Sequence, residues 1–224
     1  MCFSATASFA SSAVLATVGF ATLRKTTRPP QYAFAAIPFI FAIQQFSEGW
    51  VWASLNNATS ATWEAAPMYA FMVFAFVVWP IAIPLSICRL ENQTKKKNIM
   101  YISLALGLLL SIYYGYSIAE YGVTAIAAGH HIDYKFNRLH TINPLSVIVY
   151  ALVTVVPLFL SSAKKMWLLG VLLGVAYIVS YIFYHGYETS VWCYFASLIS
   201  LVIYWILYQN NKQESPNYNR LAIS

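Results

Sequence analysis

Glu48 is the residue best placed to do chemistry, because it is a carboxylic acid inside an apolar run, in the segment QQFSEGWVW. A carboxyl group is costly at membrane depth and usually faces other helices or a water-filled cavity. Gln44 and Gln45 precede it by four and three residues and Trp52 follows it by four, so all four share one helix face. Glu48 is therefore a proton carrier, metal ligand or substrate anchor, or else a structural hydrogen-bonding clamp between helices. We favour the functional role.

Two tyrosine-rich stripes are further candidates. The first stripe follows helical i, i+3, i+4, i+7 spacing and consists of Tyr113, Tyr116, Ser117 and Glu120. The second has nearly the same spacing and consists of Tyr177, Tyr181, Tyr184 and His185. Such stripes predict the walls of a cavity that opens to the outside. An aromatic belt at the membrane surface is an equal alternative, because tyrosine and tryptophan gather there. We expect a tyrosine of these stripes, His185, Gln44 or Gln45 to lie within hydrogen-bonding reach of Glu48.

Histidines and acidic residues supply candidate metal ligands. Zinc and copper need imidazole, carboxylate or thiolate groups that converge on one point. The candidates are His131, His140, His185 and Glu188. Because no HExxH or HxxxH pair accompanies them, ordinary polar loop histidines are the favoured alternative.

Cys2 and Cys193 are predicted near the outer ends of the first and last helices, which are neighbours in a closed bundle. They could form a disulfide in an oxidising compartment, with Cα atoms within about 7 Å. They could instead be soft copper ligands or two separately buried small residues.

The elements that position these residues are membrane-spanning helices. The chain has 224 residues, of which 60% are hydrophobic and only 9% charged, whereas soluble domains carry about 25% charged residues. Apolar runs close to the roughly 20 residues needed to cross a bilayer fall at about 5–23, 33–55, 66–88, 98–119, 142–161, 166–185 and 190–208. The sequence predicts one all-α domain over residues 1–208, a seven-transmembrane-helix bundle, with a tail at 209–224.

Loop charges predict the orientation. Eleven of the thirteen basic residues fall in alternate loops and the tail, which places those segments in the cytoplasm and the N-terminus outside. The short basic clusters form no stripe for nucleic acid. The loop at about 120–141 lies outside, and its length is typical of a functional lid or a disordered segment.

The segments MCFSATASF, AAIPFIFAIQQFSEGWVW and SVWCYFAS carry a resemblance. The sequence resembles an uncharacterised bacterial integral-membrane family, a domain of unknown function that starts MCFSA or MCWSA. The resemblance implies a multi-pass protein of the bacterial inner membrane and brings no activity with it. It draws attention to Cys2, Gln44, Gln45, Glu48, Trp52, Trp192 and Cys193.

The functional hypothesis is an outward-facing polar cavity around Glu48, lidded by the 120–141 loop, that binds a small molecule or a metal ion such as zinc or copper. The protein would be a binding or sensing protein or a metal-dependent membrane enzyme. A small proton-coupled transporter that uses Glu48 as carrier is the alternative. Retinal is not expected, because the seventh run has no lysine for a Schiff base.

Overall fold

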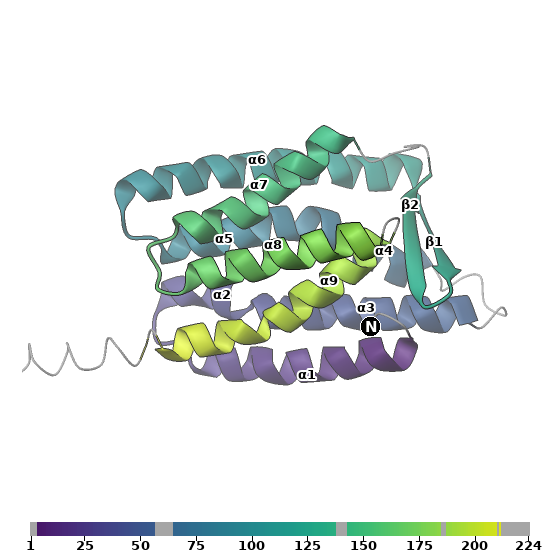
Figure 1. Ribbon diagram of the computed structural model, residues 1–224, viewed down its shortest axis with the longest axis horizontal. Coiled ribbons are helices and arrows are strands. Elements are labelled where there is room, and N and C mark those ends of the chain that lie inside the picture. Colours follow the sequence, from purple (N-terminus) through teal and green to yellow (C-terminus); the bar gives the residue numbers. More distant parts are fainter. Residues whose placement is uncertain (1–3, 57–64, 138–142, 185–186, 210, 212–224) are drawn as a thin grey trace, which may run out of the picture.

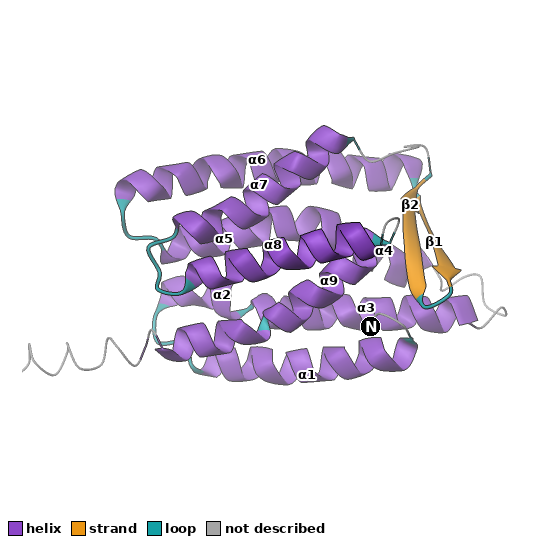
Figure 2. Cartoon of the chain, viewed as in Figure 1, coloured by secondary structure: helices purple, strands orange, loops and turns teal. Residues whose placement is uncertain are grey.

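A computed structural model describes the chain except residues 1–3, 57–64, 138–142, 185–186, 210 and 212–224. It is mostly helical, with one two-stranded sheet in its described part (Figures 1 and 2). The elements are α1 (Ala5–Arg24), a 3-10 turn (Pro29–Gln31), α2 (Tyr32–Ala35), α3 (Ile37–Asn56), α4 (Ala65–Val73), the π-helix η2 (Phe74–Val78), α5 (Trp79–Leu90), α6 (Thr94–Tyr121), β1 (Val123–Ala128), β2 (His131–Phe136), α7 (Pro144–Leu160), α8 (Met166–Phe183) and α9 (Glu188–Ile199).

Several helical stretches have the length and composition of membrane spans. Within the described residues, five are long and apolar enough: Ala5–Arg24, Ala65–Leu90, Thr94–Tyr121, Met166–Phe183 and Thr189–Gln209. The apolar helix Leu145–Leu160 is shorter. α3 is 20 residues long, but Gln44, Gln45 and Glu48 lower its mean hydropathy. The protein is therefore helical, with spans suited to a membrane.

Three predicted runs are interrupted in the structure, the run 190–208 by a turn at Ser200, and proline explains the other two interruptions. The run 33–55 breaks at Ala36, two residues before Pro38, which has no N–H to donate to the preceding turn. The run 66–88 passes through the π-helix η2 just before Pro80. Carbonyl groups of η2 accept hydrogen bonds from other helices, from Tyr150 Oη to the Ala75 oxygen at 2.7 Å and from Ser111 Oγ to the Val77 oxygen at 2.8 Å.

The two ends of the bundle differ in character (Figure 1). At one end, the α5–α6 and α7–α8 connections meet through Glu91, whose carboxylate accepts from the backbone N–H groups of Asn92, Gln93 and Ser162. Lys96 also donates to Ser162 there, at 3.0 Å. The β-hairpin lies at the opposite end.

The segment predicted as a long loop folds into this hairpin. Gly129 begins a two-residue turn with φ +61°, a conformation that glycine adopts without strain. One face of the hairpin carries Val123, Ile132, Tyr134 and Phe136, which are buried. Tyr134 stacks on Phe71 of α4, with ring centroids 4.5 Å apart. The hairpin thus caps the end of the bundle.

Candidate functional site

The inward face of α3 carries an unusual amount of polar chemistry. Gln44, Gln45 and Glu48 are each 0% exposed, and Trp52 is 3% exposed. Their spacing of three and four residues places them on one stripe, as one helical turn takes 3.6 residues. This stripe faces other helices of the protein, in particular α5 and α9.

Contacts from α5 and α9 complete the cluster. Ser190 on α9 donates through Oγ to Glu48 Oε1 at 2.6 Å. Trp79 on α5 donates through its indole N–H to Gln44 Oε1 at 2.7 Å. The Cys193 thiol lies beside the Gln44 amide and the Glu48 carboxyl. We call these six residues the polar cluster: Gln44, Gln45, Glu48, Trp79, Ser190 and Cys193.

Ser190 is the cluster member that sequence reasoning missed. None of the partners expected for Glu48 supplies the hydrogen bond that the structure records at its Oε1. The signal was present in the segment SVWC, because Ser190 stands three residues before Cys193 and therefore on the same face of a helix.

Several polar atoms in or beside the cluster have no hydrogen-bond partner within the described part of the chain. They are both amide atoms of Gln45, Trp52 Nε1 and Trp192 Nε1. A buried amide or N–H without a partner costs about 1–3 kcal/mol. Native proteins keep few such groups, and each of them calls for an explanation.

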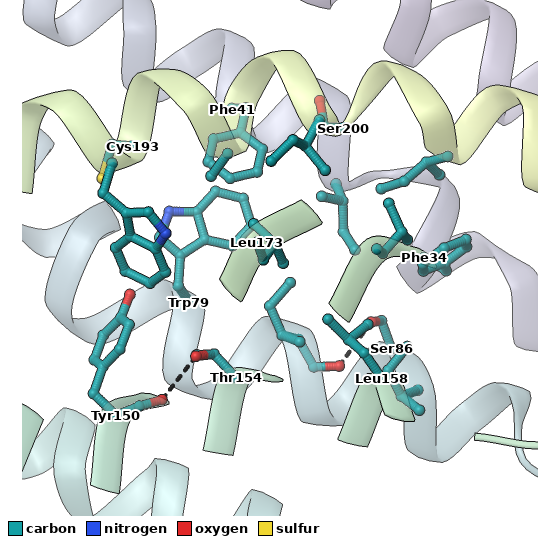
Figure 3. Close-up of a pocket in the computed structure, with 18 residues that line it drawn as sticks. Phe34, Phe41, Trp79, Ser86, Tyr150, Thr154, Leu158, Leu173, Cys193 and Ser200 are labelled. Atoms are coloured by element: carbon teal, nitrogen blue, oxygen red, sulfur yellow. Dashed lines mark hydrogen bonds between the residues drawn. The ribbon is translucent and has the colours of Figure 1, made fainter. Parts of the chain in front are cut away.

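A cavity lies next to the cluster, among residues of α2, α3, α5, α7, α8 and α9 (Figure 3). It contains about 610 Å³ of space between side chains, part of it open to the surroundings. Its hydroxyl groups are turned to backbone carbonyls: Ser86 donates to Ile83, Thr154 to Tyr150 and Ser200 to Ser197. The remaining lining is apolar apart from Cys193, Tyr150 and two tryptophans.

This cavity differs from the one that the sequence predicts. The expected cavity was polar and centred on Glu48, whereas the cavity described here is apolar and Glu48 does not line it. Cys193 and Trp79 belong to the polar cluster and also line this cavity. The polar groups therefore lie at one end of an apolar cavity.

The tyrosine stripes do not form the walls of this cavity. Tyr113 and Tyr116 are 40% and 60% exposed, Glu120 is exposed, and Tyr181 is 54% exposed. These four side chains face away from the bundle, as the alternative of an aromatic belt requires, and their role at a ligand site stays a prediction. Tyr177 packs edge-on against Trp192, with ring centroids 5.8 Å apart.

The buried face of α6 carries Tyr114 instead, one position away from the predicted stripe. Tyr114 is 1% exposed and donates to Ser146 Oγ of α7 at 2.9 Å. Successive residues on a helix point about 100° apart, so an error of one position turns a side chain from the bundle to its surroundings.

The candidate metal ligands are only partly within the described residues. His140 and His185 lie outside them, as does the side chain of Glu188. His131 stacks on Tyr187 and meets the edge of Tyr184, each at 5.2 Å, and burial lowers the pKa of its imidazole. No three His, Cys, Asp or Glu side chains converge on one point in the described ranges. The proposed metal set stays a prediction.

The cysteine pair is also left as a prediction. Cys193 is a buried free thiol, 3% exposed. Cys2 lies outside the described residues.

Comparison with known proteins places the chain in a family without assigning an activity. No curated protein matches it, and no solved structure matches it. A family model described as a family of unknown function, DUF6629, matches residues 1–218. Because that match covers nearly the whole chain, this protein belongs to the DUF6629 family of unknown function.

Proposed function

We propose that this chain is a seven-transmembrane-helix protein of the bacterial inner membrane, with its N-terminus outside, that binds a small ligand at the polar cluster. A binding or sensing role fits this arrangement best. The observation that carries the proposal is Gln45, which is 0% exposed and has no hydrogen-bond partner for either amide atom among the described residues.

A purely structural clamp does not account for Gln45. A clamp stabilises a bundle through completed hydrogen bonds, as between Ser190 and Glu48. An amide that is buried without partners instead destabilises the ligand-free protein. Retaining two adjacent glutamines on a buried helix face is reasonable if a ligand supplies the missing donors and acceptors.

The position of the cluster favours access near the outer end of the bundle. Glu48 lies in the half of α3 that approaches the hairpin, and β1 contacts both α3 and α4. The hairpin therefore covers the end of the bundle closest to the cluster. In this proposal the hairpin serves as the lid that we expect the 120–141 loop to form.

A proton-coupled transporter that uses Glu48 as carrier is the second candidate, and one observation favours it. Trp79, which binds Gln44, directly follows the π-helix η2, and Pro80 and Pro84 follow it in α5. π-helical segments and internal prolines interrupt the regular hydrogen bonds of a helix and are frequent at functional sites. A helix with such interruptions beside the cluster is suited to a change of conformation.

Glu48→Gln tests the proposal. Glutamine keeps an oxygen that accepts from Ser190 but removes the charge and the exchangeable proton. We expect the purified variant to remain folded yet to lose the small molecule or metal that native mass spectrometry and elemental analysis detect on the wild type.

The opposite result identifies a clamp. In that case Glu48→Gln retains whatever the wild type binds, while Glu48→Ala fails to fold. Proton flux into proteoliposomes that disappears in Glu48→Gln would support the transporter instead.

A further inference from the structure

The apolar cavity and the polar cluster form one continuous site, and we infer that its ligand is an amphiphile. The ligand has a single hydrocarbon chain and an uncharged head that carries a hydroxyl or carbonyl oxygen. The inference rests on the proposed function, which assigns ligand binding to the cluster, and goes beyond it by naming the chemical class.

The shape of the cavity suits a chain. Lining residues on the span Thr189–Gln209 run from Trp192 to Ile203, and those on α7 run from Tyr150 to Leu158. At 1.5 Å per residue, these stretches span roughly 16 Å and 12 Å along the helices. Figure 3 shows Cys193, Trp79 and Tyr150 at one end of the cavity and Phe34 and Leu158 at the other. A hydrocarbon chain would lie along the helices, as lipid chains do in the surrounding bilayer.

The chemistry of the cavity also favours a hydrocarbon. Its hydroxyl groups already donate to backbone carbonyls of their own helices, and Tyr150 Oη donates to the Ala75 oxygen. A polar ligand would therefore gain few hydrogen bonds in the part of the cavity that lies away from the polar cluster. Apolar cavities bind apolar molecules, because such spaces stay dry.

The end near the cluster supplies hydrogen-bond donors for a head group. Trp192 Nε1 is a buried donor without a partner within the described chain. Trp192 lines the cavity, and Gln44 lies beside Cys193, which also lines it. The Trp192 N–H suits an oxygen acceptor, and Gln45 offers both a further donor and an acceptor.

The head is uncharged for an electrostatic reason. The described residues that line the cavity include no lysine, arginine or histidine, so an ionised head would be removed from water without a compensating charge in a medium of low dielectric constant. A hydroxyl or carbonyl group adds no charge and pairs with the amides.

Photolabelling of the full chain in detergent tests the inference. The probe is hexadecanol with a diazirine in its chain and a terminal alkyne, and hexadecanoic acid with the same groups is the charged comparison. We expect saturable labelling by the alcohol, competed by unlabelled hexadecanol, at cavity-lining peptides of α7 and α9. The acid should label these peptides at least tenfold less.

Leu173→Phe fills the cavity from α8 and should lower saturable labelling at least tenfold. Val171→Phe is the matched control, since Val171 is 39% exposed on the same helix and does not line the cavity. Gln45→Leu removes the head-group amide and should weaken competition by hexadecanol at least tenfold while leaving labelling by a diazirine hexadecane unchanged.

The two ideas fail in different ways. The amphiphile inference is overturned if labelling is not saturable, or if the probe labels Leu173→Phe as strongly as Val171→Phe. The proposed function would still stand in that case if the Glu48→Gln comparison reveals a small polar ligand. If Leu173→Phe abolishes labelling but Gln45→Leu and Glu48→Gln bind like wild type, the cavity holds chains without a polar head, which overturns both the inference and the proposed role of the cluster.

Discussion

At the scale of single residues, Gln44 and Gln45 are adjacent and equally buried, yet their surroundings differ. Gln44 accepts a hydrogen bond from Trp79, whereas neither amide atom of Gln45 has a partner in the described chain. Replacing Gln45 by leucine removes two unsatisfied groups and keeps the volume. We expect Gln45→Leu to stabilise the ligand-free protein by roughly 1–3 kcal/mol, seen as a higher unfolding temperature in detergent.

Gln44→Leu is the contrasting variant, and it should lower the unfolding temperature because the buried Trp79 N–H loses its acceptor. A Gln45→Leu variant that is less stable than wild type would mean that the amide is satisfied in the ligand-free protein. That result would remove the main support for a ligand at the cluster.

Glu91 provides a prediction that depends on pH. Burial raises the pKa of its carboxyl, but hydrogen bonds from Ser162, Gln93 and Asn92 outweigh burial, and the pKa lies below its ordinary value of 4.5. A carboxyl with a lowered folded pKa stabilises the fold above about 4.5, and this contribution disappears as the pH falls through the folded pKa.

Glu91→Gln should therefore lower the unfolding temperature at pH 7, by an amount equivalent to about 1–3 kcal/mol. Its difference from wild type should shrink as the pH falls below 4.5. Glu120→Gln, at an exposed position, should behave like wild type throughout. A Glu91→Gln deficit that is the same at pH 7 and at pH 3.5 would contradict the assigned role of the charge.

At the scale of elements, the close approach of α6 to α5 depends on Gly107. A Cβ atom at this position would clash with the carbonyl oxygen of Pro80. Pro84 has no N–H to donate to that carbonyl, which leaves it facing α6. We expect Gly107→Ala to destabilise the protein by about 1–3 kcal/mol or more, because backbone must move.

Gly174→Ala on α8 is the matched control, since nothing lies within 4 Å of the added methyl group. Thermal unfolding of both variants in the same detergent decides the question. Equal stability of the two would show that α5 and α6 separate more easily than the structure indicates.

Sequence patterns predicted the helices better than their irregularities. Hydrophobic runs located α1, α6 and α8 to within about two residues at nearly every end, because burial in lipid requires long unbroken apolar segments. The hairpin was missed because β1 has no alternating polar pattern: Ala125, Ile126 and Ala127 are all apolar, and burial depends on the bundle end beneath them. The π-helix was missed because its carbonyl groups are satisfied by Tyr150 and Ser111, which are distant in sequence.

The site was predictable on α3 and not elsewhere. A carboxyl and two amides in an apolar run indicate a buried polar face, because exposing these groups to lipid would cost too much free energy. On α6, exposure of tyrosine has little cost at a membrane surface, so the pattern of Tyr113 and Tyr116 could not distinguish the inside of the bundle from the outside. The apolar cavity left no signal, because its lining residues read as ordinary core.

At the scale of the whole molecule, the distribution of basic residues and the fold indicate the same grouping of helix ends at each end of the bundle. The connections after α1, α5 and α7, together with the helix ends beside them, carry nine of the thirteen basic residues. They meet at one end through the contacts of Glu91 with Ser162, Lys96 with Ser162, and Asn211 with Lys25 and Gln31. The hairpin lies at the other end (Figure 1). Clusters of lysine and arginine remain on the cytoplasmic side of membrane proteins.

This arrangement yields a prediction of topology. A reporter active only outside the cytoplasm should work when fused at Gly129, in the turn of the hairpin. A reporter active only in the cytoplasm should work at Thr94 and Lys164, in the two basic connections. The two sites at the basic end must agree, because their segments are in contact, and Gly129 must differ from both, because whole helices separate it from them.

Replacing Lys95, Lys96 and Lys97 by glutamine should weaken the preference for this orientation without changing the fold, since these side chains act on orientation through charge. Cytoplasmic activity at Gly129 in the unaltered protein would reverse the orientation, and the hairpin would then cap a site that opens to the cell interior.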